Sequence, residues 1–215
     1  DGAPGLMRGA RRLLAGLLLA LSAAAGAAEA PREPTATFSG KGRVELAFSP
    51  WNDPEAALLK AIDEARQVIL VQAYLFTSKP LARGLVEAHR RGVRVEVLLD
   101  AESNRPSTFS VMPTLLAAAI PVAVETRYNI AHNKLMIFDP ATTHGAVATG
   151  SYNFTRSARV ANAENMLILR GNPPVVRAYA ENWQRHRAEA LAVRSLEDMP
   201  EKKGKQNGRE SDRRA

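Results

Sequence analysis

Residues 68–99 of this chain read VILVQAYLFTSKPLARGLVEAHRRGVRVEVLL. The segment from Val68 to Phe76 is almost continuously apolar and rich in β-branched residues, which is typical of a strand buried on both faces. Ser78 then opens a helical pattern that ends at Gly92. A second apolar run, Val93 to Leu99, predicts another strand. This alternation of strand and helix favours α/β layers.

The alternation continues on both sides of this stretch. Asp53-Pro54-Glu55 has the composition of a helix start, and Asn172-Pro173-Pro174 begins a long helix. Further strands are predicted at 44–48, 122–124, 135–138, 146–149 and 166–169, and a further helix at 109–120. The later strands lie close together in the sequence. We therefore expect an α/β fold with a mixed, mostly parallel sheet that carries helices on both faces, in a domain spanning residues 44–192.

Composition narrows the class of protein. The 215 residues are 46% hydrophobic and 24% charged, which excludes a largely disordered, collagen-like or coiled-coil chain. Cysteine is absent, so the chain has no disulfide, zinc ribbon or thiol nucleophile. The net charge is +7, and six basic residues fall in the last 15 positions. A moderate positive charge favours a polyanionic partner, although solubility alone would also explain it.

The two ends of the chain differ in composition from the rest. Three arginines (8, 11 and 12) precede the uncharged run Leu13–Ala28, and Ala28-Glu29-Ala30 has the small-x-small pattern of a cleavage site. We interpret residues 1–30 as a secretory signal peptide cleaved near Ala30, which predicts a periplasmic or secreted protein. An uncleaved membrane anchor is the alternative. Residues 31–43 are predicted to be a linker or N-terminal arm, and 193–215 a basic, disordered tail.

Most of the candidate catalytic residues lie between Ile130 and Asn165. His132 and Lys134 lie two residues apart at the start of a predicted strand, so both side chains point to the same face. An imidazole beside an ammonium suits a phosphate diester, because one can attack phosphorus or move a proton while the other stabilises negative charge. Asp139 follows at the far end of the same strand.

Two further segments add polar groups to this candidate site. Gly150-Ser151-Tyr152-Asn153 ends the next predicted strand, where Ser151 and Asn153 can donate to phosphate oxygens and Gly150 permits a close approach of ligand to backbone. Glu164 begins the strand after that, and its carboxylate could hold an imidazole in one tautomer.

These residues together match a known signature. His132-x-Lys134-x4-Asp139, followed by Gly150-Ser151-x-Asn153, resembles the HKD motif of the phospholipase D superfamily. The likeness covers about residues 44–190 and is strongest to the small secreted bacterial endonucleases, which carry one HKD motif per chain. One departure is that ten residues separate Asp139 from Gly150, more than the usual six. The extra length falls in a predicted turn, where insertion is tolerated.

The resemblance implies a mechanism and an assembly. One histidine attacks phosphorus to form a phosphohistidine, and a second protonates the leaving oxygen. The other histidines, 89, 144 and 186, lack the lysine and aspartate of the motif. The resemblance therefore implies a homodimer whose two copies of His132 share one site. It also implies that Glu164 supports the nucleophile, that Asp139 orients rather than donates a proton, and that neither metal nor cofactor is needed.

The resemblance indicates the class of substrate less directly than it indicates the reaction. The small basic form resembles the endonucleases, which implies hydrolysis of DNA, or of RNA, with little sequence preference. Tyr74 and Tyr152 are candidates for stacking on bases, whereas Phe76 is expected in the core. Two alternatives remain. One is a phospholipase D acting on phosphatidyl headgroups, and the other is a nucleic-acid-binding protein of a secretion system that lacks catalysis.

Overall fold

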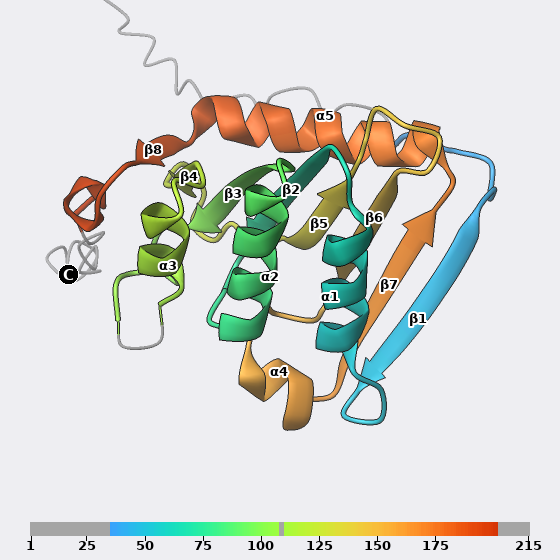
Figure 1. Ribbon diagram of the computed structural model, residues 1–215, viewed down its shortest axis with the longest axis horizontal. Helices are drawn as coiled ribbons and strands as arrows, with labels where there is room; N and C mark the ends of the chain where they lie inside the picture. Colours follow the sequence, from blue (N-terminus) through green and yellow to red (C-terminus); the bar gives the residue numbers. More distant parts are fainter. Residues whose placement is uncertain (1–34, 108–109, 202–215) are drawn as a thin grey trace, which may run out of the picture. The chain divides into compact units, whose positions relative to one another are not determined.

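The computed structural model describes residues 35–107 and 110–201, and its described residues from Phe38 onward form one compact unit. Figure 1 shows a single sheet with helices packed against it. The described strands are β1 (Arg43–Ser49), β2 (Val68–Ala73), β3 (Arg94–Asp100), β4 (Val122–Glu125), β5 (Lys134–Phe138), β6 (Ala146–Gly150), β7 (Glu164–Arg170) and β8 (Leu191–Val193). The helices are α1 (Pro54–Glu64), α2 (Lys79–Arg90), α3 (Met112–Ala117), α4 (Arg156–Val160), α5 (Pro173–Glu189) and a short 3-10 turn at Leu196–Asp198.

The helix starts follow from local sequence. The carboxylate of Asp53 accepts a hydrogen bond from the amide of Ala56 at 3.1 Å, which caps α1. The Ser78 hydroxyl accepts from the amide of Leu81 at 3.2 Å and caps α2 in the same way. The predicted starts of both helices are therefore confirmed, whereas α4 and β8 were not predicted.

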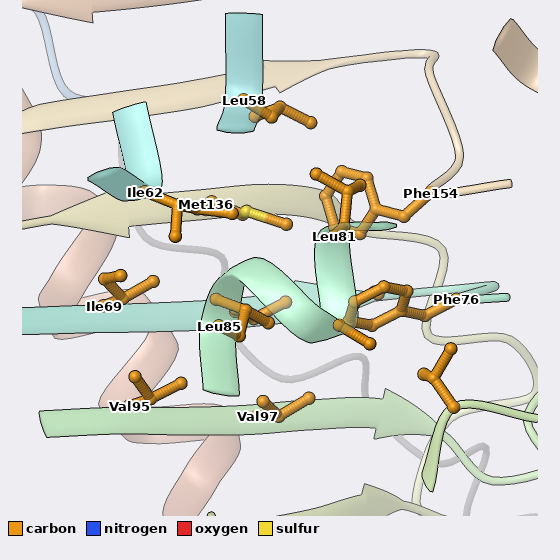
Figure 2. Packing of buried hydrophobic residues seen from close by; sticks show 14 of the residues in the cluster. Leu58, Ile62, Ile69, Phe76, Leu81, Leu85, Val95, Val97, Met136 and Phe154 are labelled. Carbon is orange, nitrogen blue, oxygen red and sulfur yellow. The ribbon is translucent and has the colours of Figure 1, made fainter. Parts of the chain in front are cut away.

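The predicted helical layers are confirmed. Buried residues of α1 and α2 pack on one face of the sheet, as Figure 2 shows for Leu58, Ile62, Leu81 and Leu85. On the opposite face, Val176 and Trp183 of α5 form a second cluster with side chains of β2, β3 and β5. The sheet is thus buried at its centre on both faces, which explains the near-continuous apolar sequence of β2 and β3.

The prediction of a mostly parallel sheet is wrong. The strand order is β1-β7-β6-β5-β2-β3-β4-β8, and of its seven described pairings only β2–β3 and β3–β4 are parallel. Parallel neighbours require a long crossover, and only α2 and α3 supply one between adjacent strands. The strands β5, β6 and β7 follow one another through shorter connections and pair antiparallel. The fold is an α/β fold with a mixed, mostly antiparallel sheet.

The boundary predicted at residue 192 also lies too early. β8 crosses that position and pairs with β4, and the 3-10 turn at Leu196–Asp198 follows it. The main-chain oxygen of Pro200 accepts a hydrogen bond from Arg105 at 2.9 Å. The first residues assigned to the tail therefore belong to the fold, while 202–215 and the proposed signal peptide lie outside the described residues. None of the helices in the described ranges is long and apolar enough to cross a membrane.

Candidate active site

One end of the sheet gathers the predicted site residues. Lys134 begins β5, Gly150 ends β6 and Glu164 begins β7, and these three strands are neighbours. Antiparallel pairing brings the start of one strand beside the end of the next. The register confirms this, because Gly150 pairs with Met166 and Glu164 pairs with Ser49 of β1.

His132 and Lys134 meet around the ring of Tyr74. The imidazole of His132 is exposed, and its ring centroid lies 4.5 Å from that of Tyr74. The Lys134 Nζ donates to the main-chain oxygen of His132 at 2.7 Å and lies 4.7 Å from the centre of the Tyr74 ring. The Tyr74 ring therefore contacts both the imidazole of His132 and the ammonium of Lys134. The imidazole remains exposed and so is open to a ligand.

The Lys134 ammonium is unusual because it is buried. Only 7% of the residue is exposed, and this burial lowers the pKa of Lys134, while the negative charge of Glu164 partly opposes the shift. A buried ammonium has given up most of its hydration. A phosphate oxygen that reached Lys134 would therefore interact with it more strongly than at an exposed surface.

Glu164 is held by Ser151 rather than by His132. Its two carboxylate oxygens accept hydrogen bonds from the Ser151 hydroxyl at 2.6 Å and from the Asn162 side chain at 2.9 Å. The expectation that Glu164 holds the imidazole is thus not met within the described chain. Asn153 lies two residues beyond Ser151, and its buried amide oxygen has no hydrogen-bond partner in residues 35–107 and 110–201. The amide nitrogen of Asn153 is the group that can donate to a phosphate oxygen.

Gly150 is required by the packing of β6 against β7, while its predicted role in the close approach of a ligand stays a prediction. A Cβ at this position would lie 2.3 Å from the main-chain oxygen of Asn165, so only glycine lets β6 and β7 approach so closely. The amides of Ser151 and Tyr152 then both donate to that same oxygen, at 3.0 and 3.2 Å. Two residues opposite one form a bulge-like end to the strand, which re-aims the side chains that follow.

This change of direction places Tyr152 in the core, so its predicted role in stacking on a base is wrong. The residue is 1% exposed and belongs to the cluster beneath α1 and α2. Burial raises the pKa of Tyr152, and its hydroxyl has no hydrogen-bond partner within the described residues. Phe76 is also buried, as predicted. Tyr74 does lie at the site, but its ring packs on His132 and Lys134.

Asp139 lies outside the site, so it is not a catalytic residue of the motif, and its contacts fit the structural or orienting role that the resemblance implied. Its carboxylate accepts hydrogen bonds from the amides of Arg66, Gln67 and Val68 at 2.9, 2.7 and 2.8 Å. It stands five positions beyond Lys134, about 16 Å along an extended strand. Asp139 therefore fastens the end of β5 to the start of β2.

We expect Asp139→Ala to lower the free energy of unfolding by about 3 kcal/mol, because three amides lose a charged acceptor. Activity per folded molecule should stay at the wild-type value. Urea unfolding and an activity assay below the transition check both parts. The control is Asp63→Ala, whose side chain is 83% exposed. Loss of activity in a fully folded Asp139→Ala variant would show that Asp139 takes part in catalysis.

Two buried polar residues that were not predicted as site residues position the site loops. One carboxylate oxygen of Asp100 accepts from the amide of Ala131 at 2.9 Å, immediately before His132. The Asn104 side chain donates to the main-chain oxygen of Tyr74 at 2.7 Å and accepts from the amide of Phe76 at 2.9 Å. Asp100 is the last residue of β3. The sequence signal that could have identified these two residues is the position of Asp100 and Asn104 at and shortly after the end of an apolar strand.

The other histidines lie away from this cluster. His186 contacts the buried Glu125 through Nδ1 at 2.6 Å, on the α5 side of the sheet. His89 is half-buried in α2, and His144 is exposed in the turn between β5 and β6. The described part of one chain therefore supplies one imidazole to the site. In residues 35–107 and 110–201, no three His, Asp or Glu side chains cluster in a way that could hold a metal ion.

Several known proteins are similar to this chain. Residues 58–187 match the family model described as "Cardiolipin synthase, PLD-like domain". The chain is 34% identical over 153 residues to a phospholipase D of Rickettsia prowazekii, covering 71% of this chain and 72% of that protein. It is 30% identical over 148 residues to the mitochondrial cardiolipin hydrolase of Xenopus tropicalis, covering 69% of this chain and 67% of that protein.

A solved structure is also similar. Nuc from Salmonella typhimurium, described as a phospholipase D family member, superposes with a TM-score of 0.67 at 30% identity, covering 72% of this chain and all of that one. The family model spans more than half of the present chain, and His132, Lys134, Asn153 and Glu164 all fall inside it. The chain therefore belongs to the phospholipase D superfamily, as a phosphodiesterase with a single PLD-like domain.

Proposed function

We propose that this protein is an exported, metal-independent endonuclease that hydrolyses DNA, and RNA as a second substrate, at a site shared by two copies of the chain. The observation that carries the proposal is the exposed imidazole of His132 beside the buried ammonium of Lys134. This pair offers a nucleophile and a charge partner for a phosphodiester. The side-chain amide nitrogen of Asn153 adds a hydrogen-bond donor for a phosphate oxygen of the same ligand.

The proposed reaction proceeds in two displacements. A ring nitrogen of His132 forms a bond to phosphorus, and the bond from phosphorus to the leaving sugar oxygen breaks. The imidazolium of the second copy gives its proton to that oxygen. Water then attacks the phosphohistidine and passes a proton back to the second copy, while the bond between phosphorus and nitrogen breaks. Lys134 stabilises the charge on the non-bridging oxygens throughout.

A nucleic acid substrate is supported by two observations. The chain carries a net charge of +7, which attracts polyanions. The similar protein Nuc is matched over its whole length at 30% identity. The test is digestion of plasmid and of single-stranded DNA in excess EDTA. Cleavage supports a metal-independent nuclease, whereas binding to DNA without cleavage would favour a protein that only binds nucleic acid.

The relatives named phospholipase D and cardiolipin hydrolase favour a second candidate function. A phosphatidyl headgroup is also joined by a phosphodiester, so the same residues could act on it. Release of headgroup from phosphatidyl vesicles, measured with the same preparation, decides between the two. Headgroup release without DNA cleavage would make this protein a lipid hydrolase.

A shared site requires a surface on which two copies meet, and we propose the outer face of β1. Val44, Leu46 and Phe48 alternate along this edge strand and are 53%, 62% and 45% exposed. They point away from Ala47, which is buried toward α1 and α2. α5 packs on this face against side chains nearer the middle of the sheet, among them Leu70, Leu135 and Val147. The uncovered apolar stripe lies next to the site, because Phe48 pairs with Asn165.

We expect Leu46→Glu to convert the protein to monomers and to lower turnover at least about tenfold, because a charge in an apolar interface is costly. Light scattering and the nuclease assay measure the two effects together. Leu191→Glu is the matched control, since Leu191 is 48% exposed on β8 at the opposite edge of the sheet. A fully active monomer would contradict the shared site.

Export rests on the sequence of residues 1–30, which lie outside the described residues. Mass measurement of the protein recovered from its native cell envelope and medium tests this part. A mature chain beginning near residue 31 supports cleavage of a signal peptide, whereas an intact N-terminus in the membrane fraction supports the anchor.

A further inference from the structure

A hollow in the surface lies at the same end of the sheet as the candidate active site. Its volume is about 1040 Å³, and it is bordered by the β1–α1 loop, the start of α2 and the helix α4. The amides of Thr77 and Ser78 on its border donate to the main-chain oxygen of Phe154, immediately after Asn153. The border of the hollow is therefore held to the chain one residue after Asn153, although none of the predicted site residues lines it. We call it the Trp51 groove.

Trp51 is the distinctive residue of this groove. It is 83% exposed, more than any other large hydrophobic residue in the described part of the chain. The only other tryptophan of the sequence, Trp183, is buried and donates to the main-chain oxygen of Val71 at 3.0 Å. Within residues 35–107 and 110–201 the Trp51 indole lies outside the buried core, so its large flat surface is available to a ligand.

The groove carries unpaired positive charge. Its two acids are already engaged, because Arg159 contacts Asp53 at 2.5 Å and Glu55 at 3.0 Å. Lys79 and Arg156 also border the groove and are exposed, and neither has a carboxylate within 4.0 Å in residues 35–107 and 110–201. The N-terminal ends of α1 and α2 are capped by the side chains of Asp53 and Ser78. The attraction for an anion therefore comes from Lys79 and Arg156.

We infer that the Trp51 groove binds the part of a single-stranded nucleic acid that leaves the catalytic site, which rests on the proposed nuclease function. A base stacks on Trp51, and Lys79 and Arg156 contact backbone phosphates. An aromatic platform flanked by cations is the combination that single strands require. A lipid surface would fit less well, because the groove is hollow and most of its bordering residues are polar or charged.

The first experiment measures binding without cleavage. The His132→Ala protein is titrated with an oligo-thymidine strand, and the fluorescence of Trp51 reports directly on stacking while the buried Trp183 supplies a constant background. We expect quenching on binding, and a Kd at least about tenfold higher when Trp51→Ala is added, measured by anisotropy of a labelled strand. Phe38→Ala is the matched control, since Phe38 is 43% exposed and does not border the groove.

Salt dependence tests the two cations separately. Lys79→Ala and Arg156→Ala should each reduce the slope of log Kd against log salt by about 0.7, because one phosphate contact is lost. Lys60→Ala, an exposed lysine on α1, should leave the slope unchanged. An unaltered Kd in Trp51→Ala, or unaltered slopes in both cation variants, would overturn the inference. So would reduced binding of Trp51→Ala to anionic vesicles with unchanged binding to the strand.

A small diester separates this inference from the proposed function. Bis(p-nitrophenyl) phosphate reaches the catalytic residues but is too short to reach the groove at the same time. With otherwise wild-type protein, Trp51→Ala should lower kcat/KM for an oligonucleotide at least about tenfold more than for the small diester. If the wild type hydrolyses neither substrate, the proposed function fails. If it hydrolyses both and Trp51→Ala affects them equally, only the groove is wrong.

Discussion

His132→Ala is expected to reduce DNA cleavage by at least about 10⁴-fold, because in the proposed shared site it removes the nucleophile of one copy and the general acid of the other. The fold should remain, since the imidazole is exposed and a substitution at such a position changes stability by about 0.5 kcal/mol or less. Plasmid cleavage in EDTA and thermal unfolding measure the two properties on the same sample.

The control for this prediction is His144→Ala, an exposed histidine in the turn between β5 and β6. It should behave as the wild type. Mixed dimers of wild type and His132→Ala extend the test, because a shared site needs both imidazoles. Activity should then fall below the value expected from dilution alone. Cleavage by pure His132→Ala at a rate near wild type would place the chemistry elsewhere.

Lys134→Met is expected to lower turnover by about 100-fold or more, since loss of one charge partner of the transition state costs about 3 kcal/mol. Its effect on stability should be small or favourable. Burial lowers the pKa of Lys134, so the charged form is less favourable in the folded than in the unfolded protein. Methionine removes that penalty, while the hydrogen bond to the main-chain oxygen of His132 is lost.

The same shift gives a pH dependence with a defined sign. A base whose pKa is lowered by folding destabilises the folded state while it is charged. This penalty is relieved as the pH rises from the lowered pKa to the ordinary value of 10.5. The wild type should therefore gain stability relative to Lys134→Met across this alkaline window, measured by urea unfolding. The opposite sign, or a fold lost at neutral pH, would show that the ammonium stabilises the structure. Lys60→Met provides the exposed control.

These predictions rest on parts of the molecule that the sequence predicted to different degrees. Segments with strong local signals were predicted well. The helix starts at Asp53, Ser78 and Asn172 and the apolar strands β2 and β3 all lie where the sequence places them. A capping side chain and a run of apolar residues act over a few positions, so their effect is visible in the chain itself.

The site was predicted in part for the same reason. The pairing of His132 with Lys134 depends on two residues in one short stretch, and the structure brings both to the ring of Tyr74. Asp139 belongs to the same stretch but faces a different environment. Its partners, Arg66 to Val68, are more than 70 positions away in the sequence. No local pattern could separate a fastening carboxylate from a catalytic one.

By itself, the sequence determined the α/β class, the starts of the main helices and the pair of residues suited to a phosphodiester, because each depends on neighbouring positions. Only the tertiary structure decided the mostly antiparallel sheet, the burial of Tyr152 and the exposure of Trp51. Strand order is set by which distant segments bury apolar surface together. The bulge after Gly150 turns Tyr152 inward, and the closing of α1, α2 and α4 around the β1–α1 loop leaves Trp51 outside. Such outcomes depend on contacts between remote segments, which no short stretch of sequence contains.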